Sequence, residues 1–199
     1  MEVDKKMNEE NNIKFDVFIK GERVDLVVLS EELIEITNWY SWFNDEENTR
    51  FMQKHYFPNT KQMQLEYFKN EIENSQTKLQ LGIVQKDKNL FCGVISLNDI
   101  NYINRCCDMG VIIGEKSSRI LQYFVESANL ICKHAFETLN MNRICSGTIS
   151  KEIHEVMLRA LGFVDEGISR KAIYKNGEYL DVYNHAMTRQ DYKSNNKKI

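Results

Sequence analysis

Residues 106–139 read CCDMGVIIGEKSSRILQYFVESANLICKHAFETL, and the spacing of apolar residues changes within this stretch. Up to Ile113 the run is short, apolar and partly β-branched, whereas from Leu121 to Leu139 apolar residues recur at intervals of three and four. The first pattern is typical of a buried strand and the second of a long amphipathic helix. Residues 143–149 form another short apolar run, so this part of the chain predicts a strand–helix–strand unit with two parallel strands.

The rest of the chain adds antiparallel elements to this unit. Asn176-Gly177 is a strong hairpin signal, because both residues readily adopt the positive φ that a tight turn requires. The other expected elements are strands at 15–19, 24–29, 79–83, 90–97, 163–174 and 179–187, and helices at 30–43, after Pro58 and at 152–160. We therefore predict an α/β (α+β) fold with a mixed, mostly antiparallel twisted sheet and helices on both faces.

The chain has 199 residues and a net charge of −3, with 42% hydrophobic and 28% charged residues. This composition predicts one globular domain at 14–192 between disordered tails at 1–13 and 193–199. The charge gives no general attraction to nucleic acid, and no apolar run is long enough for a membrane span, so we expect neither partner. The N-terminus lacks a secretion signal, and the five cysteines form no Cys-x-x-Cys pair. Both features favour a reduced, cytoplasmic protein without a metal site.

The junction between the strand at 106–113 and the following helix is the first candidate site. A helix N-terminus presents unpaired backbone N–H groups and the positive end of the helix dipole, which together attract phosphate. Arg119 would add positive charge there. The alternative is an ordinary helix start, capped by Ser117 or Ser118, that binds nothing, and the local pattern by itself favours this alternative.

Five segments, taken in chain order, resemble the motifs of one family. They are FCGVISL at 91–97, CDMGVIIGE at 107–115, AFETLNMNRI at 135–144, LGFVDEG at 161–167 and NGEYLDV at 176–182. The chain thereby resembles the GNAT N-acetyltransferases, especially the branch of ribosomal-protein and amino-sugar acetyltransferases, over residues 20–192. The resemblance implies the GNAT fold, in which two central parallel strands splay apart and hold acetyl-CoA between them.

The resemblance also implies which residues bind acetyl-CoA. Val111, Ile112 and Ile113 would pair their backbone with its pantetheine arm, and Lys151 would reach a CoA phosphate. The pyrophosphate would lie on the backbone N–H groups of Arg119, Ile120, Leu121, Gln122, Tyr123 and Phe124. This loop is a degenerate form of the family's, because Ile120, Gln122 and Phe124 stand where small residues usually let the backbone approach phosphate.

Acetyl transfer to an amine needs a base, because the amine must lose a proton before it attacks the thioester. Asp108 fills the family's acidic position on its strand and is the first candidate; the alternative is a surface carboxylate. His154 is the second candidate, because histidine titrates near neutral pH, and the alternative is a solvent-facing helix residue. His185 could border the acceptor pocket. Leu158 stands where the family often has a tyrosine that acts as an acid.

These inferences predict an acyltransferase, namely an acetyl-CoA-dependent N-acetyltransferase that acts on a primary amine of a small molecule. Aromatic residues at 39–43 and 51–57 could stack on a sugar or a nucleobase. The stretch WFNDEE at 42–47, followed by FM at 51–52, resembles acetyltransferases of bacterial surface-sugar pathways, and this resemblance implies a nucleotide-linked amino sugar as acceptor. Core packing is the alternative role of these aromatic residues. Two other functions stay open: acetylation of protein N-termini, and ligand binding by a catalytically degenerate GNAT fold. The sequence is compatible with a monomer and with a homodimer.

Overall fold

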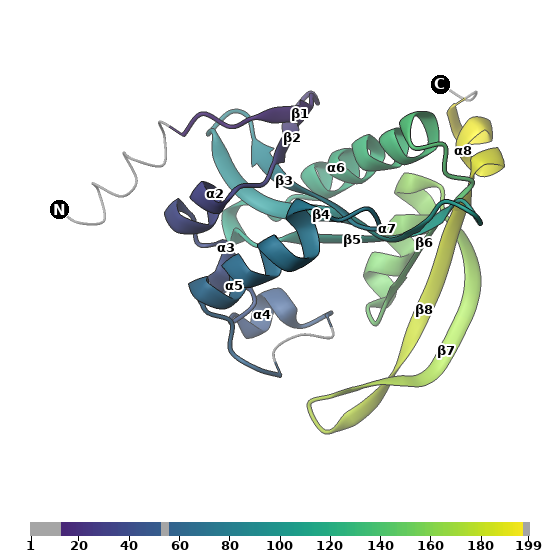
Figure 1. The fold of residues 1–199 in the computed structure, drawn as a ribbon. Helices are drawn as coiled ribbons and strands as arrows, with labels where there is room; N and C mark the ends of the chain where they lie inside the picture. The colour runs from purple at the N-terminus through teal and green to yellow at the C-terminus, as the bar shows by residue number, and fades with distance from the viewer. Residues whose placement is uncertain (1–12, 53–55, 197–199) are drawn as a thin grey trace.

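A computed structural model describes residues 13–52 and 56–196, and the described residues contain one eight-stranded sheet (Figure 1). The strands lie in the order β1-β2-β3-β4-β5-β6-β8-β7, and every neighbouring pair is antiparallel except β5 with β6. Their bounds are β1 (Val17–Ile19), β2 (Val24–Val28), β3 (Leu79–Gln85), β4 (Leu90–Asn101), β5 (Cys106–Ile113), β6 (Arg143–Thr148), β7 (Val164–Lys175) and β8 (Glu178–Thr188). This topology confirms the predicted mixed sheet with one parallel pair.

Helices connect these strands. They are α2 (Glu31–Ile36), α3 (Trp39–Trp42), α4 (Glu46–Thr49), α5 (Lys61–Tyr67), the π-helix η1 (Phe68–Glu73), the 3-10 helix η2 (Lys116–Ser118), α6 (Leu121–Lys133), the π-helix η3 (His134–Thr138), α7 (Lys151–Leu161) and α8 (Arg189–Asn196). The predicted long helix is thus α6 continued by η3. Within the described ranges, no helix is both long and apolar enough to cross a membrane.

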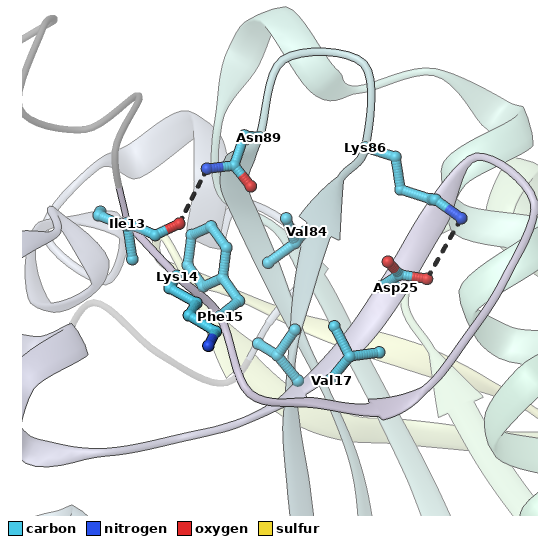
Figure 2. A pocket seen from close by; sticks show the side chains of 9 residues that line it. Ile13, Lys14, Phe15, Val17, Asp25, Val84, Lys86 and Asn89 are labelled. Carbon is cyan, nitrogen blue, oxygen red and sulfur yellow. Dashed lines mark hydrogen bonds and ion pairs between the residues drawn. The ribbon is translucent and has the colours of Figure 1, made fainter.

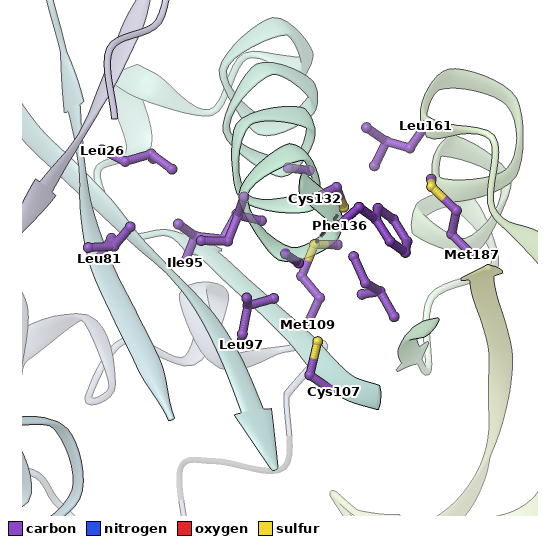
Figure 3. Close-up of a cluster of buried hydrophobic side chains, with 14 of the residues drawn as sticks. Leu26, Leu81, Ile95, Leu97, Cys107, Met109, Cys132, Phe136, Leu161 and Met187 are labelled. Carbon is purple, nitrogen blue, oxygen red and sulfur yellow. Dashed lines mark hydrogen bonds between the residues drawn. The ribbon is translucent and has the colours of Figure 1, made fainter. Parts of the chain in front are cut away.

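Two hydrophobic clusters cover the two faces of the sheet, as alternation along the strands requires. On one face, α6 and α7 pack over a core that includes Leu26, Ile95 and Phe136 (Figure 3). On the other face, α2, α3 and η1 pack with Trp39 and Phe91. Helices therefore lie on both faces, as predicted.

The predicted helix at 30–43 is broken, which corrects the sequence-based expectation. Ser30 caps α2 as expected, since its Oγ accepts from the N–H of Leu33 at 3.3 Å. The helix ends at Thr37, whose backbone is extended and whose hydroxyl and N–H both donate to the carbonyl of Leu33. A new helix, α3, then turns Trp39 into the core, where it is fully buried.

The predicted disordered tails also need correction where the structure describes them. Residues 193–196 belong to α8, which follows β8 directly. The guanidinium of Arg189 fixes the start of this helix by donating to the carbonyls of Phe136 and Met141, at 2.6 and 2.7 Å. At the other end, the carbonyl of Ile13 accepts from Asn89 Nδ2 at 2.9 Å. The remaining tail residues, 1–12 and 197–199, lie outside the described residues.

Candidate active site

The parallel strands β5 and β6 separate in the middle of the sheet. They pair at three positions only, the last of which joins Asp108 to Cys145. Beyond this point β5 continues to Ile113 along β4, while β6 continues to Thr148 along β8. A cavity of about 970 Å³ lies here, lined by both strands and by residues at the start of α6 and on α7. The observed parting of two neighbouring strands agrees with the expected splay.

The edge of β5 that faces this cleft carries free backbone groups. Ser146 Oγ donates to the carbonyl of Met109 at 3.1 Å, so the polar groups of Met109 point toward β6. Because backbone direction alternates along a strand, the N–H and C=O of Val111 and Ile113 point the same way. Those of Ile112 point toward β4, so the predicted backbone role of Ile112 is corrected. Ile112 instead contributes its side chain to the cavity wall.

The start of α6 lies at one end of the cleft. Ile120 is its N-cap residue, without a side-chain cap, so neither Ser117 nor Ser118 caps the helix. Four of the six predicted amide donors already have backbone acceptors, namely Arg119, Ile120, Tyr123 and Phe124. Among the described backbone hydrogen bonds, none is donated by Leu121 or Gln122. These two N–H groups are the ones left to bind an anion.

The bulky side chains of this segment form walls of the cleft. Ile120, Leu121 and Phe124 line the cavity, while Tyr123 is buried in the core. Arg119 also lines the cavity, and its guanidinium lies 2.8 Å from Glu47 Oε1 in α4. Ile120 and Phe124, which stand where the family usually has small residues, thus border the cavity and do not fill it.

Asp108 lies where β5 and β6 separate, and it lines the cleft. Burial, followed by the nearby charge of Asp99, raises the pKa of the Asp108 carboxyl to about 6. A carboxyl with this pKa is mostly ionised at neutral pH and can accept a proton. The position and the raised pKa of Asp108 are compatible with a role as a base.

A second cavity, of about 670 Å³, adjoins the cleft. Met52, Gly110, Val111 and Ile112 line both spaces. The second cavity has aromatic and amide walls, formed among others by Phe43, Tyr56, Phe57, Tyr67, Asn59, Gln64, Gln80 and Asn98. Two of its amides have a buried polar atom without a hydrogen-bond partner in the described residues, namely Gln64 Nε2 and Gln80 Oε1.

The sequence matches the model of a known family. A family model described as an acetyltransferase (GNAT) domain matches residues 23–164. The chain belongs to the GNAT acetyltransferase family. The expected resemblance to GNAT proteins is thereby confirmed at the level of the family.

Individual GNAT relatives agree with this assignment. YdaF of Bacillus subtilis, whose name refers to ribosomal N-acetyltransferases, is 26% identical over 102 residues, which is 51% of this chain and 55% of YdaF. YjcK of the same organism, named as an N-acetyltransferase, is 26% identical over 110 residues, which is 49% of this chain and 61% of YjcK. The matches thus span little more than half the length of these curated relatives.

Solved GNAT structures share the fold. The spermidine N-acetyltransferase from Vibrio cholerae, in complex with CoA and spermine, superimposes with a TM-score of 0.76. It is 20% identical, and the match covers 87% of this chain and 99% of that one. At this identity the likeness shows the fold alone.

The two remaining predicted site residues lie outside the described lining of the GNAT cleft. Lys151 is the first residue of α7 and is exposed. His154 is buried, with its Nδ1 3.0 Å from Nδ1 of His185 and its Nε2 3.5 Å from Asp165 Oδ1. His185 itself lines the cleft. No local pattern in the sequence pairs these two histidines, because they lie 31 residues apart on different elements.

The structure also shows where Leu158 and the aromatic residues of 39–51 lie. Leu158 packs against the main hydrophobic cluster, so this position supplies no acid. Trp39 and Trp42 belong to the core, whereas Phe43 lines the second cavity and Phe51 the cleft. The aromatic stretch therefore divides between packing and the site.

A separate depression of about 470 Å³ lies beside β1 and β2, between Ile13, Asp25 and Asn89 (Figure 2). Lys86 and Asp25 form an ion pair of 3.6 Å there. In the part of the chain that the structure describes, no group of three or more His, Cys, Asp or Glu side chains could hold a metal ion.

Proposed function

We propose that this chain is an N-acetyltransferase that uses acetyl-CoA to acetylate a primary amine. The observation that carries the proposal is the parting of β5 and β6 beyond Asp108, next to free amides at the start of α6. The residues fit the co-substrate. Val111 and Ile113 offer backbone donors and acceptors to the amide-rich pantetheine arm, and Leu121 and Gln122 offer N–H groups to the diphosphate.

The chain's own residues would act on the acceptor amine as follows. When bound, acetyl-CoA supplies an activated acetyl thioester. Asp108 accepts a proton from the acceptor's ammonium group, and the resulting neutral amine attacks the thioester carbonyl. The bond from nitrogen to the acetyl carbon forms, and the carbon–sulfur bond breaks. The cleft and the second cavity share Met52, Gly110 and Val111, so the amine and the acetyl group can meet there.

We propose an amino sugar, linked to a nucleotide, as the acceptor. Among the described residues that line the second cavity, Lys78 is the only charged side chain and no carboxylate is present. Such a lining is poorly suited to a polyamine, because several positive charges would lack partners. It suits a hydroxyl-rich ligand, which can bond both to the unpartnered Gln64 Nε2 and to Gln80 Oε1. The exposed aromatic rings of Tyr56, Phe57 and Tyr67 can stack on a base.

A protein N-terminus is the second candidate acceptor. The name of YdaF supports it, since YdaF is a relative named for ribosomal N-acetyltransferases. A backbone amine followed by peptide groups would also bond to Gln64 and Gln80. The aromatic wall beside these amides favours the sugar nucleotide.

Calorimetry and an acceptor screen test the proposal. We expect acetyl-CoA to bind, and acetyl transfer to be fastest with a nucleoside-diphosphate amino sugar, compared with the free amino sugar, spermidine and N-terminal peptides. Faster transfer to a peptide would replace the sugar with the protein acceptor. Binding of CoA without transfer to any amine would establish a degenerate GNAT fold. No heat and no thermal stabilisation at millimolar acetyl-CoA would overturn the proposal, because ligand at 100 times its dissociation constant stabilises a protein by about 2.7 kcal/mol.

A further inference from the structure

We propose that His185 and His154 form a proton-donating pair, held by Asp165, that protonates the thiolate released in the cleft. The proposal rests on the proposed acetyl transfer. It adds the acid that this chemistry uses after Asp108 has acted as the base. His154 and Asp165 would be positioning residues, since they act through His185.

The contacts form a continuous line from the cleft to the surface. His185 lies on β8, is 1% exposed and lines the cleft. Its Nδ1 lies 3.0 Å from Nδ1 of His154 on α7. Nε2 of His154 lies 3.5 Å from Asp165 Oδ1 on β7, whose side chain is 59% exposed. Within the described residues, Nε2 of His185 is buried and has no hydrogen-bond partner.

We assign the tautomers of both rings from these contacts. The carboxylate of Asp165 favours a hydrogen on Nε2 of His154, which leaves Nδ1 of a neutral His154 as an acceptor. His185 must then donate from its own Nδ1, so its Nε2 carries a lone pair. When the pair gains one proton, the hydrogen bond between the two Nδ1 atoms reverses its direction. His154 becomes an imidazolium that donates from both nitrogens, Nδ1 of His185 accepts, and Nε2 of His185 carries a hydrogen.

This reversal supplies the proton that the leaving group needs. When the carbon–sulfur bond breaks, its electron pair stays on sulfur as a thiolate. The Nε2–H of His185 is transferred to sulfur, and the hydrogen on Nδ1 of His154 moves to Nδ1 of His185. His154 is then neutral. The acylated nitrogen loses its second proton to water, and Asp108 also releases its proton to water. Water returns one proton to Nε2 of His185, and the hydrogen on Nδ1 of His185 moves back to Nδ1 of His154, so the pair is restored and one proton is released for each acetyl group transferred.

The place of His185 in the sheet suits this role. β6 lies between β5, which carries Asp108, and β8, which carries His185. His185 pairs across the ladder with Ser146, the residue that bonds to Met109 where β5 and β6 separate. The proposed acid and base therefore flank the same strand at the parted end.

The surrounding charges determine which of the two histidines carries the added proton. Burial, and then the charge of His154, lower the pKa of His185 to about 4, so the proton does not stay on His185. Asp165 and Glu166 are the acidic groups on β7, and Glu166 is paired with Arg143 on β6. Asp165 is left to stabilise a charged His154, against which Tyr183 packs with a ring separation of 5.5 Å.

Nitrogen NMR of the full chain with labelled histidine tests the pair without any substrate. The sequence has only four histidines, and His154→Gln and His185→Gln assign the relevant signals. We expect Nε2 of His185 to be unprotonated at high pH and to gain its hydrogen in the same step in which His154 becomes an imidazolium. In Asp165→Asn this step should move to lower pH. A hydrogen on Nε2 of His185 at every pH, or two independent titrations, would overturn the proposal.

Kinetics then test the role in transfer. His185→Gln should lower kcat by about 100-fold, the usual scale of acid catalysis, with an unchanged dissociation constant for CoA. Asp165→Asn should move the high-pH limb of the kcat profile to lower pH, whereas a purely structural role would lower kcat equally at every pH. His134→Gln is the matched control and should leave kcat unchanged. If wild-type protein transfers acetyl groups and His185→Gln keeps its kcat, the pair is not the acid although the proposed function stands. If acetyl-CoA does not bind, the proposed function fails first.

Discussion

Asp108 joins two properties that a base in this cleft requires, a place at the parted strands and a pKa of about 6. Because only the ionised carboxyl accepts a proton, kcat should rise with pH through about 6, below the high-pH limb that the histidine pair sets. Asp108→Asn should lower kcat by about 100-fold or more and remove this limb, with little change in the affinity for CoA. A steady-state pH profile together with CoA calorimetry checks both parts.

The matched control for this variant is Asp16→Asn, which removes an exposed carboxylate far along the chain. This control should keep the wild-type kcat and the rise of kcat with pH through about 6. If Asp108→Asn turned over at the wild-type rate, Asp108 would not belong to the mechanism. If it lost CoA binding instead, the carboxyl would be a structural support of the cleft.

Gln80 offers a second test at the scale of one residue. Its Oε1 is buried in the second cavity without a described partner. Gln80→Leu should leave the fold as stable or slightly more stable, because an unsatisfied buried acceptor is removed. It should also raise KM for the amino sugar by about tenfold, because one bond to a hydroxyl is lost. Gln62→Leu on the exposed side of α5 is the control, and equal KM values in the two variants would contradict the proposed acceptor contact.

At the scale of elements, the sequence predicted what local periodicity controls. The change of spacing at residues 113–121 correctly predicted β5 and α6, and Asn176-Gly177 correctly predicted the turn between β7 and β8. The break between α2 and α3 was missed, because it depends on the hydroxyl of Thr37 and on core space for Trp39. The start of α8 was missed for the same kind of reason, since Arg189 finds its acceptors more than 45 residues away.

Glu47 of α4 forms ion pairs beside the start of α6. Glu47 pairs with Arg119 and also with Lys116, each at 2.8 Å. A bound diphosphate would compete with Glu47 for these cations. Glu47→Gln should therefore bind CoA up to about fivefold more tightly at low salt, since an exposed ion pair contributes at most about 1 kcal/mol. The gain should shrink at high salt.

Calorimetry at two salt concentrations measures this effect, with the neighbouring Glu46→Gln as the control. Weaker binding by Glu47→Gln would mean that α4 must stay tied to Arg119 for the cleft to keep its shape.

The attachment of α8 gives a stability test at the same scale. Arg189 donates to the carbonyls of Phe136 and Met141 and to Asn140 Oδ1, the last at 2.9 Å. Arg189→Ala leaves these acceptors without their donor and should cost about 1–3 kcal/mol. For a chain of this size that corresponds to a fall in Tm of roughly 2–12 °C. Arg170→Ala, at an exposed position of β7, should leave Tm unchanged, and an equal fall in both variants would contradict the anchoring role.

At the scale of the whole molecule, the site is made by elements that meet only in the folded chain. The family resemblance pointed to Asp108, whereas the start of α6 could be predicted locally, because a change of periodicity is a local feature. From the sequence, His185 carried little weight and His154 was expected to face the reaction centre. The actual contact between their rings depends on how α7 packs against β8, and no local pattern encodes this packing.

Asp108 and His185 also affect the stability of the whole molecule, with opposite signs. Between pH 4 and 6, Asp108 holds a proton in the folded state but not in the unfolded state, so its contribution to stability falls as pH rises. His185 holds a proton in the unfolded state but not in the folded state up to about pH 6.5, so its contribution rises with pH. In wild-type protein the two slopes oppose each other. Relative to wild type, Tm of Asp108→Asn should increase more steeply from pH 4.5 to 6, and Tm of His185→Gln should decrease. Scanning calorimetry across this range measures both slopes, and parallel curves for all three proteins would show that neither group changes its proton affinity on folding.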